Sequence, residues 1–458
     1  MTGTRGGVAT AYARLTDAER AMTCLVHDPD TYTSGVPYAA LATLRANHRL
    51  VPVAEPALPG WTEGAGYWLV LRHDDVERVL KDPGTFSSGL GGTQIRDPGT
   101  DSDLAYVRRM MLNMDPPEHS RLRRMLARSF TPRAVARLEE QVTAHVSGIV
   151  DRMLGDDASG ECDFAKDVAA DLPLLTLADV LGVPAQDRWL MFDWSNRVIG
   201  WQDPDYARST AFDGRTGTDL ARNALRLRPS PAPDGLMPDP RSRRGMPDLY
   251  AYANGLGAAK RLQPGEDVMS ILMAQRDDSG GSVTVEEFEN LFWLFAVAGN
   301  ETLRNGIPGG MHALLVHPQV QARLREDPSR IGAAVEEMLR WWTPVMTFRR
   351  TATGPIQLGD AMLERGDKVV VSFSSANRDP AVFEDPERFD VARGGRAHLA
   401  FGHGPHFCLG AHLARVQMRA MFTEVLTRTS RLEPVGDPAW LRSNFQRGVK
   451  RLPLAWAR

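Results

Sequence analysis

The chain has 458 residues, 43% of them hydrophobic, and a formal net charge of -3. This composition allows a large buried core, and the near-neutral charge gives no reason to expect a nucleic-acid partner. Cys24, Cys162 and Cys408 lie far apart and are odd in number, which excludes a disulfide framework and favours a reduced setting. With no signal peptide and no run of about 18 apolar residues, we expect a soluble, cytoplasmic protein with no membrane association.

Helical periodicity dominates the chain. Candidate helices cover residues 73–82, 118–130, 132–154, 283–306, 317–327, 331–342 and 409–428. Strand patterns are fewer and cover 68–72 and 368–374, and LRSNFQRGVKRLPLAW near the C-terminus predicts a hairpin. The mixture predicts a mostly α fold with a small β region. Because no repeat and no clear linker divide it, we expect a single domain over residues 1–458.

A segment rich in Pro and Arg, RLRPSPAPDGLMPDPRSRR at 226–244, has little apolar periodicity. It predicts a long surface loop inside a flexible insertion at about residues 213–246. A disordered insertion and a lid over a pocket are both open interpretations.

The stretch FGHGPHFCLG, at 401–410, places one cysteine in a glycine-rich loop just before a predicted helix. Most single cysteines are small buried hydrophobes. Here the glycines expose backbone amides near the sulfur, and the positive end of the following helix stabilises a thiolate. No second Cys or paired His stands at zinc-finger spacing, so a closed tetrahedral site is disfavoured. A lone Cys408 thiolate on heme iron fits best.

A second unusual feature is Glu301-Thr302 inside the apolar run LFWLFAVAGNETL. A carboxyl group in such a helix is costly unless it is used, and the alternative, a helix turn exposed at the surface, is disfavoured by the apolar residues before it. Gly299 would let the helix open locally, and Pro308 would add a kink.

The Cys408 loop closely resembles the cysteine-ligand loop of the cytochromes P450, the heme-thiolate monooxygenases. Its matching positions are Phe401, Gly402, His406, Cys408 and Gly410. Three further motifs follow the order of that family, so the resemblance covers nearly the whole chain. It implies a prism-shaped, mostly α fold with heme b between the long central helix and the Cys loop with the last helix.

The resemblance also implies roles for individual residues. Cys408 would be the axial iron ligand, and Glu301 with Thr302 would deliver protons to bound O2. The implied cofactor-binding residues are His119, Arg123, Ala298, Arg350, His406, Cys408 and Gly410, with Arg349 as the alternative to Arg350. Leu303 departs from the family pattern, which usually has a second Thr there, and would alter the pocket wall or the order of water.

Glu337 and Arg340 lie three apart on a predicted helix, where their side chains can pair. A surface ion pair is the ordinary interpretation of such spacing. The resemblance implies instead a buried structural pair joined by an arginine from a later segment. Arg388 is the first choice for that arginine, and Arg393 competes with it.

The substrate pocket is expected to be apolar. Leu294, Ala298 and Thr302 are spaced by four on one helix stripe. Val345 and Met346 are placed in the same pocket, since Met346 alternates with Phe348 and Arg350 in an extended segment. GGTQI, DWSNRVIGWQDPDYA, VAGNETLRNGI and LRSNFQRGVK resemble bacterial members that oxidise sterols, terpenoids or branched lipids.

The implied reaction is insertion of one oxygen atom of O2 into a C–H bond of an apolar small molecule, such as a sterol, a terpenoid or a natural-product intermediate. Electrons would come from NAD(P)H through a separate ferredoxin reductase and ferredoxin. We expect the chain itself to be a monomer. Arg121, Arg124 and Arg128 would help to dock an acidic ferredoxin, or form a plain solvated face. The alternatives are O-demethylation of an aromatic ether, peroxide-driven oxidation and a heme-thiolate gas sensor. The Glu301-Thr302 pair argues against the last two.

Overall fold

The computed structural model describes residues 7–57, 62–199, 203, 216–231, 238–240, 242–359, 361–393 and 397–458. Contacts between residues gather into two compact units. Unit 1 comprises Met1–Asp97, Ala333–Cys408 and Ala439–Val449; unit 2 comprises Pro98–Gly332, Leu409–Pro438 and Lys450–Arg458. Helices dominate and the sheets are small, as predicted, whereas the single domain stays a prediction. Within the described part of the chain, every helix is too short or too polar to cross a membrane.

A five-stranded sheet with the order β1-β2-β8-β5-β3 organises unit 1. The strands are β1 (Leu50–Val53), β2 (Tyr67–Val70), β3 (Phe86–Ser87), β5 (Thr347–Ala352) and β8 (Lys368–Ser372). The central strand, β8, runs parallel to β2 and antiparallel to β5, and Val369, Val370 and Val371 on it are fully buried. A continuous β-branched run suits a strand that is covered on both faces. A separate pair joins β6 (Ile356–Leu358) to β7 (Ala361–Leu363).

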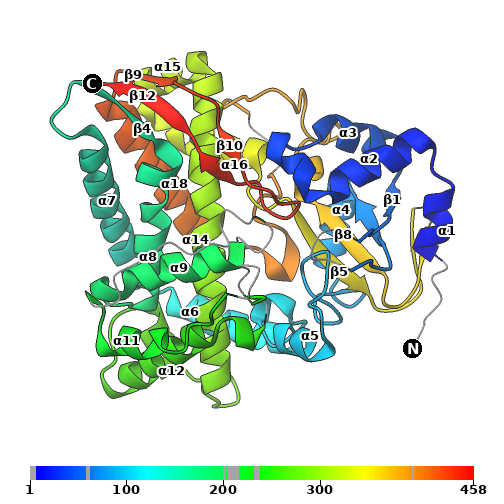
Figure 1. Ribbon diagram of the computed structural model, residues 1–458, viewed down its shortest axis with the longest axis horizontal. Helices are drawn as coiled ribbons and strands as arrows, with labels where there is room; N and C mark the ends of the chain where they lie inside the picture. The colour runs from blue at the N-terminus through cyan, green and yellow to red at the C-terminus, as the bar shows by residue number, and fades with distance from the viewer. Residues whose placement is uncertain are drawn as a thin grey trace. The chain divides into compact units, whose positions relative to one another are not determined.

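Unit 1 also contains short helices (Figure 1). They are α1 (Gly7–Ala13), α2 (Asp17–His27), α3 (Tyr38–Asn47), α4 (His73–Lys81), α17 (Phe373–Ala376) and α16 (Ile331–Trp342), the last from Ala333 onward, with 3-10 turns η1 (Pro29–Ser34) and η8 (Gly404–His406). Helices α1 and α2 pack against β1, and α4 packs against β8. A capping box between Thr16 and Glu19 fixes the start of α2.

Unit 2 is a helical body. Its helices are α5 (Asp101–Val107), α6 (Glu118–Ser129), α7 (Pro132–Leu154), α8 (Asp171–Leu181), α9 (Arg188–Ile199), α11 (Asp219–Leu225), α12 (Pro247–Leu262), α13 (Val268–Ala274), α14 (Val285–Val316), α15 (Pro318–Glu326) and α18 (Ala411–Arg428). Its short turns are η2 (Met111–Asn113), η3 (Phe164–Ala169), η4 (Ala185–Asp187), η6 (Arg243–Gly245) and η7 (Pro328–Arg330). A sheet of order β4-β12-β9 joins β4 (Ser159–Asp163), β12 (Pro453–Ala457) and β9 (Arg431–Pro434).

Helix α14 is the longest in the described part of the chain, and α8, α9, α12 and α18 pack against it (Figure 1). A capping box fixes its start: the Thr284 hydroxyl accepts from the Glu287 amide, while the Glu287 side chain accepts from the Thr284 amide. The helix continues through Pro308 without a break in its assignment. Trp194, Tyr252 and Phe292 stack edge to face or tilted where α9, α12 and α14 meet.

Two strand predictions were wrong in part. The strand predicted at 368–374 ends at Ser372, because Phe373 opens α17, capped by the Ser372 hydroxyl. The predicted C-terminal hairpin is confirmed only in its first part: β10 (Ala439–Trp440) and β11 (Val449–Arg451) form a two-stranded sheet, and the Leu441 amide donates to the Gly448 carbonyl at 3.0 Å, whereas β12 pairs with β4 and β9. Alternation along a strand identifies a strand but not its partner.

The predicted insertion at 213–246 is described only in part, since residues 213–215, 232–237 and 241 lie outside the described residues. The described part contains α11 and η6. Arg228 forms an ion pair with Asp193 of α9 at 2.9 Å, and Arg243 forms one with Glu289 of α14 at 2.8 Å. These arginines are therefore tied to the helices of unit 2.

Candidate active site

The Cys408 loop of unit 1 is a tight turn built on two glycines. The Gly402 amide donates to the Leu399 carbonyl, and the Cys408 amide donates to the Phe401 carbonyl, both at 2.9 Å. Gly402 and Gly404 have φ angles of 70° and 69°, which glycine adopts without strain. Cys408 itself is half-buried, lies at the end of the loop and forms no disulfide.

Gly404 also decides how closely the loop approaches α4. A Cβ atom at this position would lie 2.4 Å from the carbonyl oxygen of Leu80, which is backbone and cannot swing aside. Turn η8 packs against α4, and His403 Nδ1 lies 3.7 Å from Glu77 Oε1. The glycine of the motif is therefore required by a close backbone contact.

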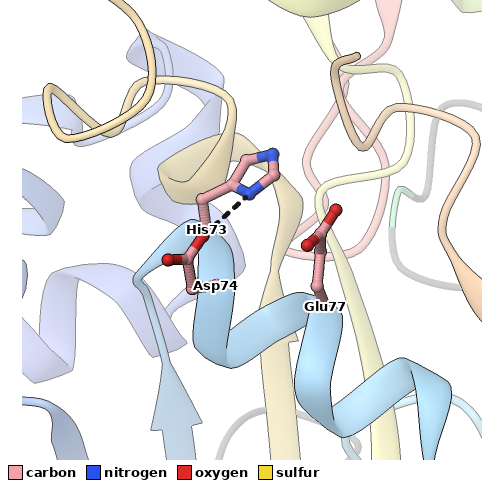
Figure 2. A group of neighbouring side chains, drawn as sticks. All are labelled: His73, Asp74 and Glu77. Atoms are coloured by element: carbon pink, nitrogen blue, oxygen red, sulfur yellow. Dashed lines mark ion pairs between the residues drawn. The ribbon is translucent and has the colours of Figure 1, made fainter. Parts of the chain in front are cut away.

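Three potential metal ligands, His73, Asp74 and Glu77, gather at the start of α4 (Figure 2). Their ligand atoms lie within 4.8 Å of one another, and His73 Nδ1 is 3.7 Å from Asp74 Oδ1. Acidic side chains are favoured in the first turn of any helix by its dipole. Nothing else among the described residues points to an ion here, so we assign no metal site.

Two of the residues predicted to bind the cofactor, His406 and Arg350, lie in unit 1. His406 Nε2 is 3.2 Å from the Ser88 hydroxyl. Arg350 is 3% exposed, and its guanidinium donates to the Arg349 carbonyl at 2.9 Å. Arg349 forms an ion pair with Asp97 at 2.8 Å. Because the Arg349 guanidinium already pairs with the Asp97 carboxylate, Arg350 stays the preferred candidate for binding the cofactor.

The predicted pocket residues of unit 1 precede strand β5. Met346 is buried, its amide donates to the Phe445 carbonyl, and its carbonyl accepts from the Phe373 amide, both at 2.8 Å. Val345 is partly buried and forms an isolated bridge with Gln446. Met346 thus lies one residue before β5, and the pocket role of both residues stays a prediction.

Glu337 and Arg340 form a buried, bidentate ion pair. The two Arg340–Glu337 bonds measure 2.7 and 2.8 Å, and the side chains are 2% and 3% exposed. The Asp390 amide donates to the same carboxylate at 2.8 Å. Burial of the pair confirms the prediction that it is not a surface ion pair.

Arg340 also connects this pair to the Cys408 loop. Its guanidinium donates to the carbonyls of Asn377, at 2.7 Å, and Pro386, at 2.9 Å. The side-chain oxygen of Asn377 accepts from the Leu399 amide at 2.7 Å, at the point where the loop begins. The network therefore holds the base of the loop in unit 1.

The third member of this network is Arg393, so the first choice from the sequence, Arg388, was wrong. Arg393 Nε lies 3.5 Å from Glu337 Oε1, and its guanidinium donates to the Asp385 and Arg388 carbonyls at 3.1 and 3.2 Å. Arg388 contributes its backbone carbonyl, which accepts from both arginines, while its side chain is exposed. Adjacent turns of an irregular segment offered two candidates that spacing alone could not separate.

In unit 2, Glu301 and Thr302 lie on different faces of α14, because successive helical residues are rotated by about 100°. Glu301 is 1% exposed and accepts a hydrogen bond from the Ser195 hydroxyl of α9 at 3.3 Å. Thr302 is half-buried and donates to the Ala298 carbonyl at 3.0 Å. The acid faces α9, and the alcohol shares a stripe with Ala298.

This stripe is the open side of an otherwise buried helix. Ala298 is exposed, and Leu294 and Thr302 are half-buried, whereas Asn300 and Leu303 are buried. Small Ala298 leaves space beside its neighbours, as the predicted pocket requires. The role of the stripe in binding substrate or cofactor remains a prediction.

Gly299 lies where α8 approaches α14, and its predicted role in a local opening of the helix stays a prediction. A Cβ atom there would lie 2.9 Å from Cδ1 of Leu177, so glycine permits the close approach of α8 to α14. The predicted kink at Pro308 does not interrupt the helix. Leu303, the departure from the family pattern, is 5% exposed and lies away from the open stripe.

The remaining predicted cofactor-binding residues also lie in unit 2. His119 and Arg123 stand four apart on α6, where His119 is 2% exposed and Arg123 is half-buried. Gly410 is the N-cap residue of α18, which begins at Ala411, two residues after the predicted start at 409 and directly after the cysteine motif. Binding of a cofactor by these residues stays a prediction.

The basic face of α6 is matched by acidic groups within unit 2. Arg121 forms ion pairs with Asp277, at 3.1 Å, and with Glu287. Arg124 and Arg128 both pair with Asp278, at 3.3 and 3.0 Å. The side chains that were considered for docking a ferredoxin are therefore engaged in ion pairs.

Sequence reasoning did not identify four polar residues that surround Glu301 or adjoin it on α9 and α14: Ser195, Asn196, Asn300 and Arg304. All four are buried. A signal existed, since Asn300 and Arg304 flank the acid in an apolar helix, but their partners on α9 come from a distant part of the chain.

Comparison with known proteins identifies the same family as the sequence motifs. The family profile described as Cytochrome P450 matches residues 258–438. The steroid C26-monooxygenase of Rhodococcus jostii (strain RHA1) is 34% identical over 426 residues, which cover 92% of this chain and 82% of the relative. The methyl-branched lipid omega-hydroxylase of Mycobacterium tuberculosis (strain ATCC 25618 / H37Rv) is 35% identical over 420 residues, covering 91% and 90%.

Solved structures of cytochromes P450 are also similar to this chain. Cytochrome P450 CYP268A2 of Mycobacterium marinum, in complex with pseudoionone, superposes with a TM-score of 0.76 at 33% identity, covering 95% of this chain and 96% of that one. CYP108D1 from Novosphingobium aromaticivorans DSM12444 has a TM-score of 0.77 at 28% identity, covering 95% and 98%. With this fold, and with relatives more than 30% identical over most of their length, the chain belongs to the cytochrome P450 family and is a monooxygenase that uses heme b and O2.

Proposed function

We propose that this monooxygenase hydroxylates a C–H bond near the end of a branched, apolar chain, such as a sterol side chain, a terpenoid or a branched lipid. The names of two relatives support this class, because C26 of a steroid and the omega carbon of a branched lipid are both distal carbons of an aliphatic chain. The pseudoionone held by a third relative is also an apolar chain compound. The apolar stripe of Leu294 and Ala298 supports the same class, with Val345 and Met346 as further lining residues.

The single observation that carries the proposal is the Cys408 loop. It presents one half-buried thiol, outside any disulfide, at the end of a turn that contains two glycines with positive φ. A thiolate is the soft donor expected for heme iron, which would supply the O2 chemistry when bound. We propose that the Cys408 sulfur would hold this iron.

We propose, from the motif matches, that arginine and histidine side chains bind the two carboxylates of heme b. Arg350 and His406 belong to unit 1, and His119 and Arg123 belong to unit 2. Guanidinium and imidazole N–H groups donate hydrogen bonds to carboxylates. We assign these four to the propionates, and Ala298 and Gly410 to the surroundings of the macrocycle.

We assign proton delivery to Glu301 and Thr302. Insertion of one oxygen atom into a C–H bond releases the other as water, so each turnover uses two electrons and two protons. The buried carboxyl of Glu301 accepts a proton from solvent and passes it on, and the Thr302 hydroxyl donates a hydrogen bond beside it.

Electrons come from NAD(P)H through redox partners. We propose a ferredoxin and its reductase as these partners, with the chain acting as a monomer in the cytoplasm. Three widely separated free cysteines support a reduced compartment. Turnover with a ferredoxin system, compared with peroxide alone, tests the electron source, and light scattering of the purified protein tests the monomer.

The axial ligand is tested by absorbance of the ferrous–CO complex. The parent should show the red-shifted Soret band of thiolate ligation, Cys408→His should lose it, and Cys24→Ala and Cys162→Ala should keep it. Retention of the band by Cys408→His would contradict the assignment. The substrate class is tested by titrating sterols, branched fatty acids, terpenoids and aromatic ethers and following the shift in iron spin state; a response to aromatic ethers alone would reject the class.

A further inference from the structure

Helices α9 and α14 contact each other through a set of mostly polar side chains. Three residues of each helix take part, and their spacing places them on one side of that helix. On α9 they are Phe192, Ser195 and Asn196, and on α14 they are Asn300, Glu301 and Arg304. Except for Phe192, each is at most 9% exposed.

The Ser195 hydroxyl stands at the centre of this face. Its Oγ donates to Glu301 Oε1 at 3.3 Å and accepts from Asn300 Nδ2 at 2.8 Å. A hydroxyl carries one donor and two acceptor positions. Because the Asn300 amide occupies an acceptor position, the single O–H of Ser195 is turned toward the carboxylate.

This use of a mid-helix serine is unusual. A serine inside a helix commonly donates to the carbonyl one turn before it. Ser195 instead donates across to α14, where a buried carboxylate is costly unless it accepts hydrogen bonds. The Ser195 hydroxyl therefore donates its hydrogen bond to the Glu301 carboxylate and not to the backbone of α9.

A second contact one turn along holds the two helices together independently of Ser195. Arg304 donates to Asn196 Oδ1 at 2.5 Å, and its guanidinium lies 4.7 Å from the centre of the Phe192 ring. Trp194 on another side of α9 donates to Asp248 of α12 at 2.9 Å. Removing one hydroxyl therefore leaves α9 anchored.

We propose that Ser195 is a positioning residue that fixes the Glu301 carboxylate for proton delivery, with Asn300 orienting its hydroxyl. The inference rests on the proton role proposed for Glu301. For each of the two protons that a turnover uses, the carboxyl gives one proton toward the oxygen and regains one from solvent, so Glu301 and Ser195 both end unchanged. Asn300 Oδ1 is buried and meets no donor among the described residues, so it can accept from the water that restores the proton.

The test compares Ser195→Ala with Ser195→Thr, which keeps the hydroxyl. The matched control is Ser129→Ala, which removes another fully buried hydroxyl of unit 2 that donates to the Met125 carbonyl at 3.0 Å. Loss of a hydrogen bond to a charged group costs enough free energy to change an equilibrium constant or a rate about tenfold. Ser195→Ala should therefore lower product formed per NAD(P)H consumed by about 5- to 10-fold, with the lost fraction appearing as hydrogen peroxide. Ser195→Thr and Ser129→Ala should stay near the parent.

Two measurements do not depend on turnover. The substrate dissociation constant from the spin-state shift should be unchanged in Ser195→Ala. In a double-mutant cycle with Glu301→Gln, the shifts in the urea unfolding midpoint should be non-additive, as they are for residues in contact. Additive shifts would remove the contact on which the inference depends.

The outcomes separate this inference from the function on which it rests. If Glu301→Gln impairs turnover but Ser195→Ala is coupled as well as the parent, the positioning role is rejected and the proton role stands. If Glu301→Gln itself behaves as the parent, both are rejected. Should Ser195→Ala fail to fold, Asn300→Ala takes its place, because loss of the group that orients the hydroxyl should produce the same excess of peroxide; normal coupling there would also reject the role.

Discussion

Two glutamates of this chain are almost equally buried and have very different surroundings. Glu337 in unit 1 is 4% exposed and meets Arg340 through bonds of 2.7 and 2.8 Å. Glu301 in unit 2 is 1% exposed and accepts from the Ser195 hydroxyl over 3.3 Å. Burial alone therefore does not distinguish a carboxylate in a structural ion pair from one that we propose to carry protons.

The two partners, Arg340 and Ser195, differ in what they can do. A guanidinium stays protonated in proteins, and Arg340 donates to both oxygens of the Glu337 side chain. A hydroxyl can donate to the anion and can also accept from the neutral acid. The surroundings of Glu337 suit a permanent support for the Cys408 loop, and those of Glu301 suit a group that gains and loses a proton.

The largest expected effect is loss of the Glu337 charge. Glu337→Gln leaves Arg340 buried without its anion, which should lower the free energy of unfolding by about 3–5 kcal/mol. The urea unfolding midpoint and the yield of heme-loaded protein measure this. Asp327→Asn is the matched control, because Asp327 and Arg330 also stand three apart at 2.9 Å but are exposed, and exposed ion pairs contribute little to stability. Equal effects in the two variants would contradict the structural role.

The next variant, Glu301→Gln, should separate activity from stability. The amide keeps the shape of the side chain but cannot carry the proton, so turnover should fall about 100-fold or more. The unfolding midpoint should move far less than in Glu337→Gln. Product formation at saturating substrate is the measurement, and a reduction of less than about threefold would mean that another group or a chain of water supplies the protons.

Thr302→Ala should leave consumption of reductant largely intact and change where the electrons go. Without the hydroxyl, we expect more hydrogen peroxide and less product per NAD(P)H. The bond from Thr302 to the Ala298 carbonyl is lost as well, so Thr302→Ser, which can remake it, is the control. Full coupling in Thr302→Ala would place the relay elsewhere.

Much of the fold could be predicted from local pattern. The helices at 118–130 and 132–154 begin and end within a residue of the predictions, because Pro and capping residues mark their ends. The C-terminal hairpin forms between β10 and β11, but LPLAW does not belong to it, because its pattern predicts a strand while its pairing with β4 and β9 depends on contacts with segments far away in the sequence.

The candidate site shows the same limit. The Glu337–Arg340 pair was predictable since both residues lie on one helix turn. Ser195 was not, because its partner Glu301 is more than a hundred residues away and nothing in DWSNRVI marks the face that turns toward α14. Local spacing identifies partners within an element, and only packing identifies partners between elements.

The smallest expected effect decides between the two arginines that the sequence could not separate. Arg393 lies 3.5 Å from Glu337 and donates to two carbonyls at 3.1 and 3.2 Å, with its side chain only 13% exposed. Arg393→Gln should therefore cost about 1–2 kcal/mol of unfolding free energy, since it removes hydrogen bonds but leaves the Glu337–Arg340 pair in place.

Arg388→Gln should change the unfolding free energy by less than about 0.5 kcal/mol, as expected for an exposed side chain whose backbone carbonyl is kept. Parallel urea titrations of the two variants measure the difference. If Arg388→Gln were the more harmful change, the bonds to Glu337 would have to come from Arg388. The second guanidinium beside the Glu337 carboxylate would then come from another turn of the chain. The comparison of Glu337 with Glu301 would in that case need a different explanation.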